Sequence, residues 1–200
     1  MKNLSEVRCS DFSVLMKEKL AGTAPIWSNL VVISFPLPWL ANMNESEQLY
    51  KLFNKKLKID DLKSKLDDYR FQFVAPDKDY MPEGLTKVLL FNRNSEDSYF
   101  SRVQKSEFDI PDEKLGNFLI DLIDKNEKYF NNYILKSKKI RDLFVCTHAS
   151  RDICCGLAGT PIYKSLKEKF NDYEISSTRV WRMSHLGGHK YAPNVLDMPA

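Results

Sequence analysis

Residues 142–170 read DLFVCTHASRDICCGLAGTPIYKSLKEKF, and this stretch decides the fold class. Its first seven residues, DLFVCTH, form the short apolar run of a buried strand. A polar loop that contains glycine, ASRDICCGLAG, follows this run. Thr160 and Pro161 then have the side chains expected at the N-cap and the first position of a helix, PIYKSLKEKF. A strand, a loop and a helix in this order predict an α/β fold.

The alternation of elements extends in both directions from this stretch. On the C-terminal side, residues 173–185 and 191–199 predict two further strands. On the N-terminal side, the spacing of apolar residues predicts helices over 44–66 and 111–130. The apolar stretch 29–36 predicts a buried strand, and stretches closed by turn residues predict further strands at 69–76, 86–93 and 98–111.

The order of these elements divides the chain into two parts. The order β-α-β-β-β-α is followed by β-α-β-β, which indicates two related α/β halves without a repeat at the level of residues. The basic stretch NNYILKSKKIR between them is typical of a solvated connector. We therefore place the first half at 1–130, the linker at 131–141 and the second half at 142–200.

Composition and charge exclude several classes of protein. Hydrophobic residues at 43% and charged residues at 28% are ordinary for a globular protein of 200 residues. The net charge of +3 is too small to indicate nucleic acid or an anionic membrane as a partner. The N-terminus has no sustained apolar stretch, and the longest apolar run, LVVISFPLPWL, is too short to span a bilayer. We expect a cytoplasmic protein.

Cysteine and histidine are concentrated in one region. Without a sign of export a disulfide framework is not expected, so this clustering indicates a metal site or thiol chemistry. Six of the seven residues of these two types fall between positions 146 and 189; the seven are Cys9, Cys146, Cys154, Cys155, His148, His185 and His189.

The stretch SHLGGHK, residues 184–190, separates two histidines by the spacing of a metal-binding helix. In the zinc protease signature a glutamate follows the first histidine, but here Leu186 stands in that place. Two adjacent glycines would also cost a helix about 2 kcal/mol relative to alanines. We therefore predict a loop that carries an imidazole on each side, in which His185 and His189 face one ligand.

The positions of the cysteines suggest that they bind the same group as the two histidines. Cys146 lies where a strand ends, and Cys154 and Cys155 lie in the loop before the predicted helix, near Arg151, where the thiolate form is favoured. Two thiolates and two imidazoles suit either zinc or a [2Fe-2S] cluster with mixed ligands. The eight residues between Cys146 and Cys155 exceed zinc-finger spacing and favour the larger group.

Two alternatives remain open on these grounds. One is a structural zinc domain in a binding module. The other is a thiol oxidoreductase without a metal that uses Cys146, Cys154 or Cys155, although the usual C-x-x-C arrangement is absent. We find no nucleotide-binding motif.

The motifs CTHASRDICCGLAGTPIY and HLGGHKYAPNVLDMP resemble the sucrase/ferredoxin-like family. The N-terminal CSDFSVLMKEKLAGTAPIWSNLVVISFPLPW is similar to bacterial-type members. The resemblance implies two thioredoxin-like halves and a [2Fe-2S] cluster. Carried over by motif, the ligands would be Cys146, Cys155, His185 and His189.

The function implied by the resemblance is electron transfer. An imidazole bound through one nitrogen keeps an N–H on the other, so we expect electron uptake coupled to proton uptake. Electrons would come from a separate reductase, and the sequence names neither this donor nor the acceptor. No pair of carboxylates indicates glycoside hydrolysis.

The remaining residues near the site receive simpler interpretations. We expect His148 to make a turn hydrogen bond, Asp152 to cap the local turn, and Cys9 to be inert. Cys154 is expected as a spare ligand, as a thiol beside the ligands, or as a residue that packs under the loop.

The family pattern continues beyond LDMP, whereas this chain stops at Ala200. We therefore expect the second half to lack a last strand and helix, which leaves an open sheet edge. A second copy of the chain in a homodimer is one way to cover that edge.

Overall fold

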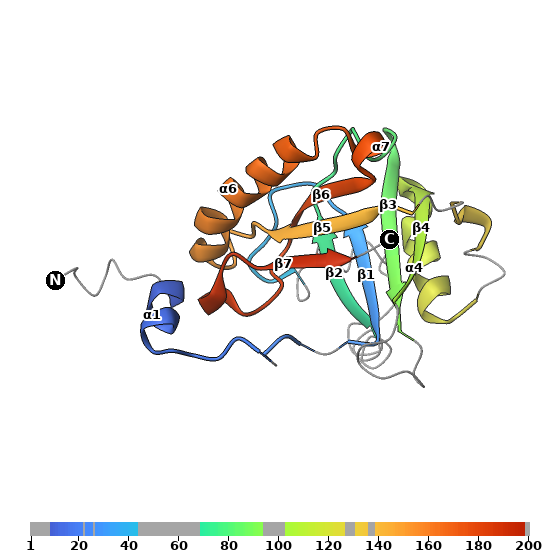
Figure 1. Cartoon of the computed structure of the whole chain (residues 1–200). Helices are drawn as coiled ribbons and strands as arrows, with labels where there is room; N and C mark the ends of the chain where they lie inside the picture. The colour runs from blue at the N-terminus through green and yellow to red at the C-terminus, as the bar shows by residue number, and fades with distance from the viewer. Residues whose placement is uncertain are drawn as a thin grey trace. The chain divides into compact units, whose positions relative to one another are not determined.

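The computed structural model describes residues 9–21, 23–25, 27–43, 69–93, 103–126, 131–135 and 139–198. The helix predicted over 44–66 lies outside these residues. The chain forms two compact units (Figure 1). The middle unit is Trp27–Lys138, and the terminal unit combines Met1–Ile26 with Lys139–Ala200. The N-terminal segment thus groups with the end of the predicted linker and the residues that follow it.

The middle unit contains a mixed sheet in the order β4-β3-β1-β2. Its strands are β1 (Asn29–Ser34), β2 (Tyr69–Val74), β3 (Leu85–Asn92) and β4 (Gln104–Pro111). β1 runs parallel to β2 and antiparallel to β3, and β4 is antiparallel to β3. β1, β2 and β4 lie within the predicted strands, and β3 begins one residue before its predicted start at Thr86.

One helix covers a face of this sheet. The 3-10 helix η3 (Asp112–Lys114) leads into α4 (Leu115–Ile123), and a second 3-10 helix, η4 (Asn131–Tyr133), follows. Apolar residues at helical spacing on α4, among them Phe118 and Leu122, are buried against Val31 and Val88 of the sheet. Pro111 ends β4 and caps η3, so it is not inside the helix as the sequence predicted.

The strands of the terminal unit lie in the order β6-β5-β7. β5 is parallel to β6 and antiparallel to β7. The predicted α/β class is confirmed; that the two parts are thioredoxin-like stays a prediction. The elements of this unit are α1 (Cys9–Leu15), β5 (Arg141–Cys146), α6 (Ile153–Lys169), α7 (Tyr173–Ser176), β6 (Thr178–Met183), the 3-10 helix η5 (His189–Tyr191) and β7 (Val195–Met198).

Helix α6 corrects the predicted loop. It begins at Ile153, so Thr160 is not its N-cap and Pro161 lies inside it. The actual N-cap is Asp152, whose carboxylate accepts a hydrogen bond from the Cys154 N–H at 2.9 Å. This cap starts the helix before the glycines that indicated a loop.

The strand predicted over 173–185 is wrong in its first part. Asp172 accepts hydrogen bonds from the backbone N–H groups of Glu174 and Ile175 and thereby starts the short helix α7. β6 begins only at Thr178, after Ser177 has reversed the chain with a φ of 49°.

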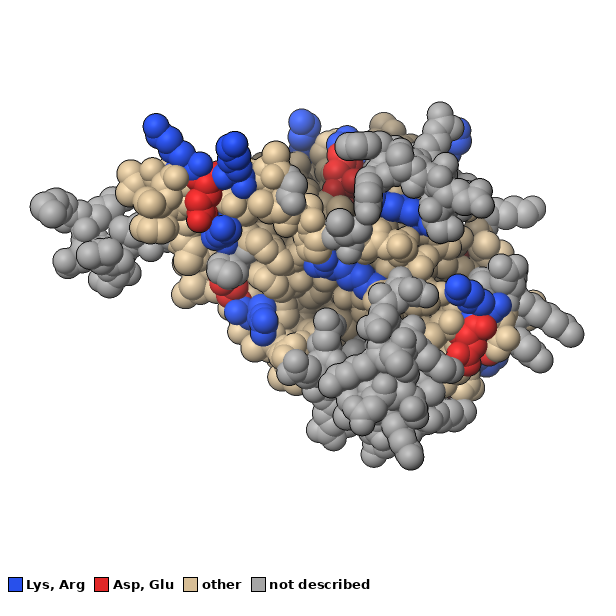
Figure 2. Space-filling view, turned by 90° about the horizontal axis from the view of Figure 1, so that it is seen from below, with Lys and Arg blue, Asp and Glu red and all other residues tan. Residues whose placement is uncertain are grey.

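The helix lengths and the distribution of charged side chains both bear on the surfaces that the protein can contact. No described helix combines the length and the apolar character that crossing a membrane requires. On the face shown in Figure 2, described Lys and Arg side chains lie in separate groups, several of them beside Asp or Glu.

Candidate metal centre

The candidate site lies at the carboxyl ends of two parallel strands. Cys146 is the last residue of β5 and pairs with Met183, the last residue of β6. His185 follows Met183 by two positions. In open α/β sheets this edge is the usual place for a ligand, because the loops that leave parallel strands meet there.

Three predicted ligands converge at this edge. The Sγ atoms of Cys146 and Cys155 and an imidazole nitrogen of His185 all lie within 4.8 Å of one another. The Cys155 Sγ is 3.4 Å from the His185 Nδ1. Both cysteines are fully buried and neither forms a disulfide. Two thiols and an imidazole at this separation form a donor set that suits a thiophilic metal or an iron-sulfur cluster.

Glycines on α6 allow the helix to bring Cys155 to Cys146. A Cβ atom on Gly159 would lie 1.9 Å from the Cys146 carbonyl oxygen, and one on Gly156 would lie 2.4 Å from the Ala149 Cβ. No larger residue fits either position without moving the helix. Two glycines three residues apart were the sequence signal for this close approach, which the predicted loop missed.

The two cysteines have coupled acidities. A hydrogen bond from Cys155 lowers the pKa of Cys146 to about 7, and the backbone N–H groups of Leu186 and His148 act in the same direction, against the effect of burial. The same pairing, together with burial, raises the pKa of Cys155 above its usual value. The pair therefore carries one negative charge more easily than two separate thiols would.

The HLGGH stretch forms a loop, as its glycines predict. Gly187 and Gly188 have φ values of +90° and +60°, which other residues rarely adopt. Asn194 fixes this turn, because its Nδ2 donates to the carbonyl oxygens of Gly187 at 2.7 Å and Gly188 at 2.9 Å.

The His148 side chain contacts the backbone of a predicted ligand, His185. It is buried, and its Nδ1 accepts a hydrogen bond from the His185 N–H at 3.1 Å. The predicted turn hydrogen bond therefore reaches a second loop and holds one of the predicted ligands.

The structure does not place the remaining cysteines and histidine in the group of three described donors. His189 begins η5, and its side chain lies outside what the structure describes, so its role as a ligand stays a prediction. Cys154 is buried in the first turn of α6 and does not belong to the group of three. Cys9 is exposed at the start of α1.

The N-terminal segment reaches the same region, which the sequence did not predict. Helix α1 packs on η5. Glu18 forms an ion pair with Lys190 at 3.2 Å, and the Tyr191 hydroxyl donates to the Lys19 carbonyl oxygen at 3.2 Å. These contacts attach α1 and the residues as far as Lys19 to the loop that carries the second predicted histidine.

Several known proteins are similar in sequence to this chain over part or most of its length. Altered inheritance of mitochondria protein 32 of Meyerozyma guilliermondii is 22% identical over 219 residues, which cover 95% of this chain and 74% of that protein. The protein of the same name from Candida glabrata is 41% identical over 54 residues, which cover 27% of this chain and 17% of that protein. Actin patches distal protein 1 of Saccharomyces cerevisiae is 26% identical over 111 residues, which cover 48% of this chain and 35% of that protein.

No solved structure matches the chain. The profile of the sucrase/ferredoxin-like family matches residues 20–200, which include the complete β5–α6 and β6–β7 motifs. The chain therefore belongs to the sucrase/ferredoxin-like family.

Proposed function

We propose that the protein is an electron carrier that holds a [2Fe-2S] cluster through Cys146, Cys155, His185 and His189. The observation that supports this proposal best is the convergence of Cys146, Cys155 and His185 within 4.8 Å. When bound, such a cluster would supply transfer of one electron at a time.

The side chains around the site have distinct roles in this proposal. Cys146 and Cys155 supply thiolates, and the lowered pKa of Cys146 reduces the cost of deprotonation on binding. The backbone N–H groups of Leu186 and His148 are directed at the Cys146 sulfur. Hydrogen bonds to a ligand sulfur raise a reduction potential, because they stabilise added negative charge.

Burial of the two cysteine sulfur atoms is a second way in which the protein would control the cluster. Cys146 and Cys155 have no exposed surface, whereas His185 is partly exposed. Bulk water is therefore excluded from the sulfur atoms, and the imidazole side of the site is the one that solvent or a partner protein can reach. The expected coupling of electron and proton uptake at the imidazoles stays a prediction, as do the cytoplasmic location, the separate reductase and the acceptor.

The hydrogen bond between the two thiols favours one alternative. Cys146 and Cys155 are close enough to interact, so a metal-free dithiol that cycles to a disulfide is the second candidate function. A zinc site formed by the same residues is the third.

Anaerobic purification separates the three candidates. We expect red-brown protein with about two iron and two acid-labile sulfide per chain, and a paramagnetic signal that appears on reduction. Colourless protein with one zinc per chain would replace the proposal by the zinc module. Colourless, metal-free protein that accepts no cluster in reconstitution and forms a Cys146–Cys155 disulfide would replace it by the thiol oxidoreductase.

A further inference from the structure

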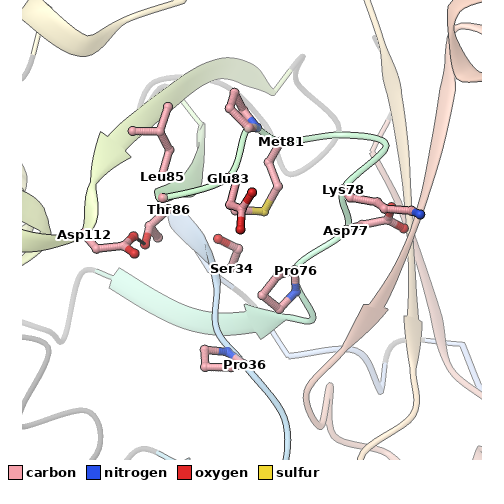
Figure 3. A pocket seen from close by; sticks show the side chains of 12 residues that line it. Ser34, Pro36, Pro76, Asp77, Lys78, Met81, Glu83, Leu85, Thr86 and Asp112 are labelled. Carbon is pink, nitrogen blue, oxygen red and sulfur yellow. Dashed lines mark hydrogen bonds between the residues drawn. The ribbon is translucent and has the colours of Figure 1, made fainter.

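The middle unit contains a cavity of about 690 Å³ at one edge of its sheet (Figure 3). Ser34, at the end of β1, lines it, and so does the loop that follows β2. Because β1 and β2 are parallel, this is the carboxyl edge at which open α/β sheets usually bind ligands. The volume is in the range of small-molecule sites, roughly 300–1,000 Å³.

Much of the cavity wall is apolar. Pro36 follows β1, Pro76 follows β2, and Met81, Pro82 and Leu85 belong to the connection into β3. Prolines restrict the backbone, so this wall is formed before a ligand arrives. Such a surface suits the hydrocarbon part of a ligand.

A buried hydroxyl group opens into the cavity. Ser34 is 5% exposed, and its Oγ accepts a hydrogen bond from the Lys87 N–H at 2.8 Å. Among the described residues, no acceptor takes the hydrogen of this hydroxyl. A buried donor without a partner is costly, so the Ser34 O–H is available to an oxygen of a ligand.

Two carboxylates, those of Glu83 and Asp112, line the same cavity. The Thr86 hydroxyl donates to Asp112 Oδ1 at 2.7 Å, which orients that carboxylate and leaves Oδ2 without a hydrogen bond to any described residue. Glu83 forms neither a hydrogen bond nor an ion pair with the part of the chain that is described. Figure 3 shows its carboxylate turned toward Ser34 and Thr86.

The charges of the cavity favour a cation. Asp77, Glu83 and Asp112 contribute three acidic groups, against one basic group from Lys78. In Figure 3 the Lys78 side chain points away from Glu83 and Ser34. The excess of acidic groups would repel an anionic ligand, whereas an ammonium group would form charge-assisted hydrogen bonds with the Glu83 and Asp112 carboxylates.

We propose that this cavity binds an organic ammonium compound with an apolar body and a carbonyl oxygen near the charged group, as in an amino-acid amide or the N-terminus of a peptide. Glu83 and Asp112 accept hydrogen bonds from the ammonium group, and Ser34 donates to the carbonyl oxygen. The apolar body lies against Met81, Leu85 and the prolines. None of these residues belongs to the metal centre, so this site exists whether or not a cluster is bound.

Leucinamide is the probe, and N-acetylleucinamide is its uncharged counterpart. Titrations of the full chain are followed by the backbone amide signals of Ser34, Gly84 and Leu85 in two-dimensional NMR at pH 6, below the α-amino pKa of about 7.7–8.0. Leucinamide is expected to shift these signals saturably and to bind about tenfold more tightly than N-acetylleucinamide. Equal affinities, or shifts confined to other residues, would overturn the proposal.

Variants test the assigned groups. Glu83→Gln keeps the shape of the side chain and is expected to weaken leucinamide binding about tenfold, and Ser34→Ala about threefold. Glu113→Gln removes an exposed acid next to Asp112 that does not line the cavity, so it should change the affinity less than about twofold. An unchanged affinity in a folded Glu83→Gln protein would contradict the assignment.

A further titration, with a short peptide, identifies which kind of compound supplies the ammonium group. Leu-Gly-Gly-amide binding more tightly than leucinamide supports the site as one for peptide N-termini, and weaker binding supports a free amino-acid amide. If neither compound binds, the cavity is not an ammonium site.

Discussion

His148 accepts a hydrogen bond from the backbone N–H of His185, with 3.1 Å between its Nδ1 and that nitrogen. This bond joins the loop after β5 to the loop after β6. A neutral imidazole that accepts at Nδ1 carries its proton on Nε2, so the contact also fixes the tautomer of His148. The side chain is a positioning residue, because it holds the backbone of a predicted ligand and does not itself belong to the donor set.

We expect replacement of His148 to loosen the site. His148→Leu removes the acceptor and should speed the loss of iron to a chelator by about tenfold to a hundredfold, the range known for outer partners of metal ligands. His148→Asn supplies an amide oxygen and should restore part of the loss. The measurement is the rate at which the visible absorbance fades. Equal rates of iron loss in wild type and His148→Leu would show that His148 does not position the predicted ligand.

The two adjacent cysteines should behave differently. Cys155→Ser removes a thiol from the converging group and should reduce iron and sulfide content by more than the roughly tenfold effect of an outer partner, and Cys146→Ser should do the same. The measurement is metal and sulfide analysis of protein purified without oxygen.

Cys154→Ser and Cys9→Ser are the matched controls. Cys154 is next in sequence to Cys155 but lies outside the converging group, and Cys9 is exposed. Both variants should keep the full iron and sulfide content. A loss in Cys154→Ser together with full content in Cys155→Ser would reverse the assignment within the pair.

Gly159 should resist substitution even by alanine. Alanine favours a helix by about 1 kcal/mol over glycine, but its Cβ would lie 1.9 Å from the Cys146 carbonyl oxygen. We expect Gly159→Ala to lower the free energy of unfolding by about 1–3 kcal/mol, as for other overpacked sites. Ser165→Ala, at an exposed position of the same helix, should change it by less than about 0.5 kcal/mol. Urea denaturation of both variants measures the difference.

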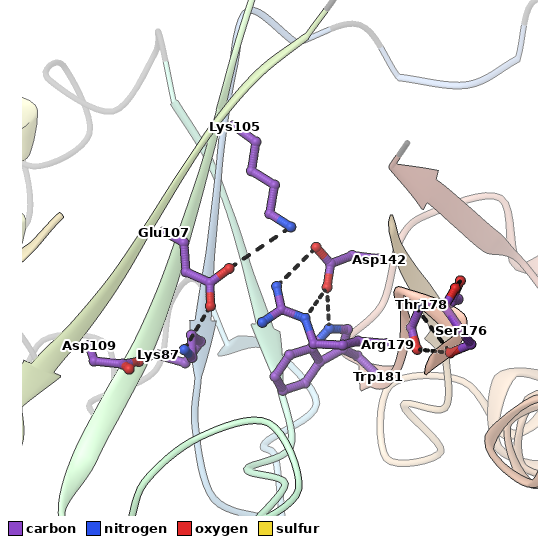
Figure 4. A network of polar contacts seen from close by, with 9 residues as sticks. All are labelled: Lys87, Lys105, Glu107, Asp109, Asp142, Ser176, Thr178, Arg179 and Trp181. Carbon is purple, nitrogen blue, oxygen red and sulfur yellow. Dashed lines mark hydrogen bonds and ion pairs between the residues drawn. The ribbon is translucent and has the colours of Figure 1, made fainter. Parts of the chain in front are cut away.

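A buried ion pair at the other end of β5 supports the strand pairing (Figure 4). The Asp142 Oδ1 accepts hydrogen bonds from the Arg179 Nε and the Trp181 Nε1, each at 2.8 Å. All three residues are buried. Asp142→Asn removes the buried negative charge that pairs with Arg179, so we expect a loss of about 3–5 kcal/mol in the free energy of unfolding.

The neighbouring pair Arg141–Asp197 is the exposed control. Arg141 Nε donates to Asp197 Oδ1 at 2.8 Å, and both side chains are about half exposed, at 46% and 47%. Asp197→Asn should cost only about 0.2–1 kcal/mol. A loss as small as this in Asp142→Asn would show that the buried pair contributes little.

The Arg141–Asp197 pair should also respond to pH. The hydrogen bond from Arg141 lowers the pKa of Asp197. Because this pKa is lower in the folded chain than in the unfolded one, the stabilisation is present at neutral pH and is lost as the pH falls below about 3.9, the ordinary aspartate value. The difference in unfolding free energy between wild type and Asp197→Asn should therefore shrink from pH 6 to pH 2.5. A difference that grows on acidification would contradict this linkage.

The sequence by itself determined the features that depend on neighbours along the chain. Apolar runs identified β1 and β5, because a strand buried on both faces needs such a run, and turn residues at the strand ends identified β2 to β4. The two glycines between His185 and His189 excluded a helix there, since Gly187 and Gly188 adopt positive φ. The clustering of cysteine and histidine placed the candidate site in the second half of the chain before any contact was known.

Only the tertiary structure decided which groups meet. Asp152 starts α6 at Ile153, and Gly159 lets the helix approach Cys146, so the sulfur of Cys155 and not that of Cys154 joins the group. Apart from the family motif, the order of residues does not distinguish the two cysteines, because they differ by a rotation about a helix axis that packing fixes. The same holds for the cavity beside Ser34, whose lining residues span positions 34 to 112 and become neighbours only when β1, β2 and β3 pair.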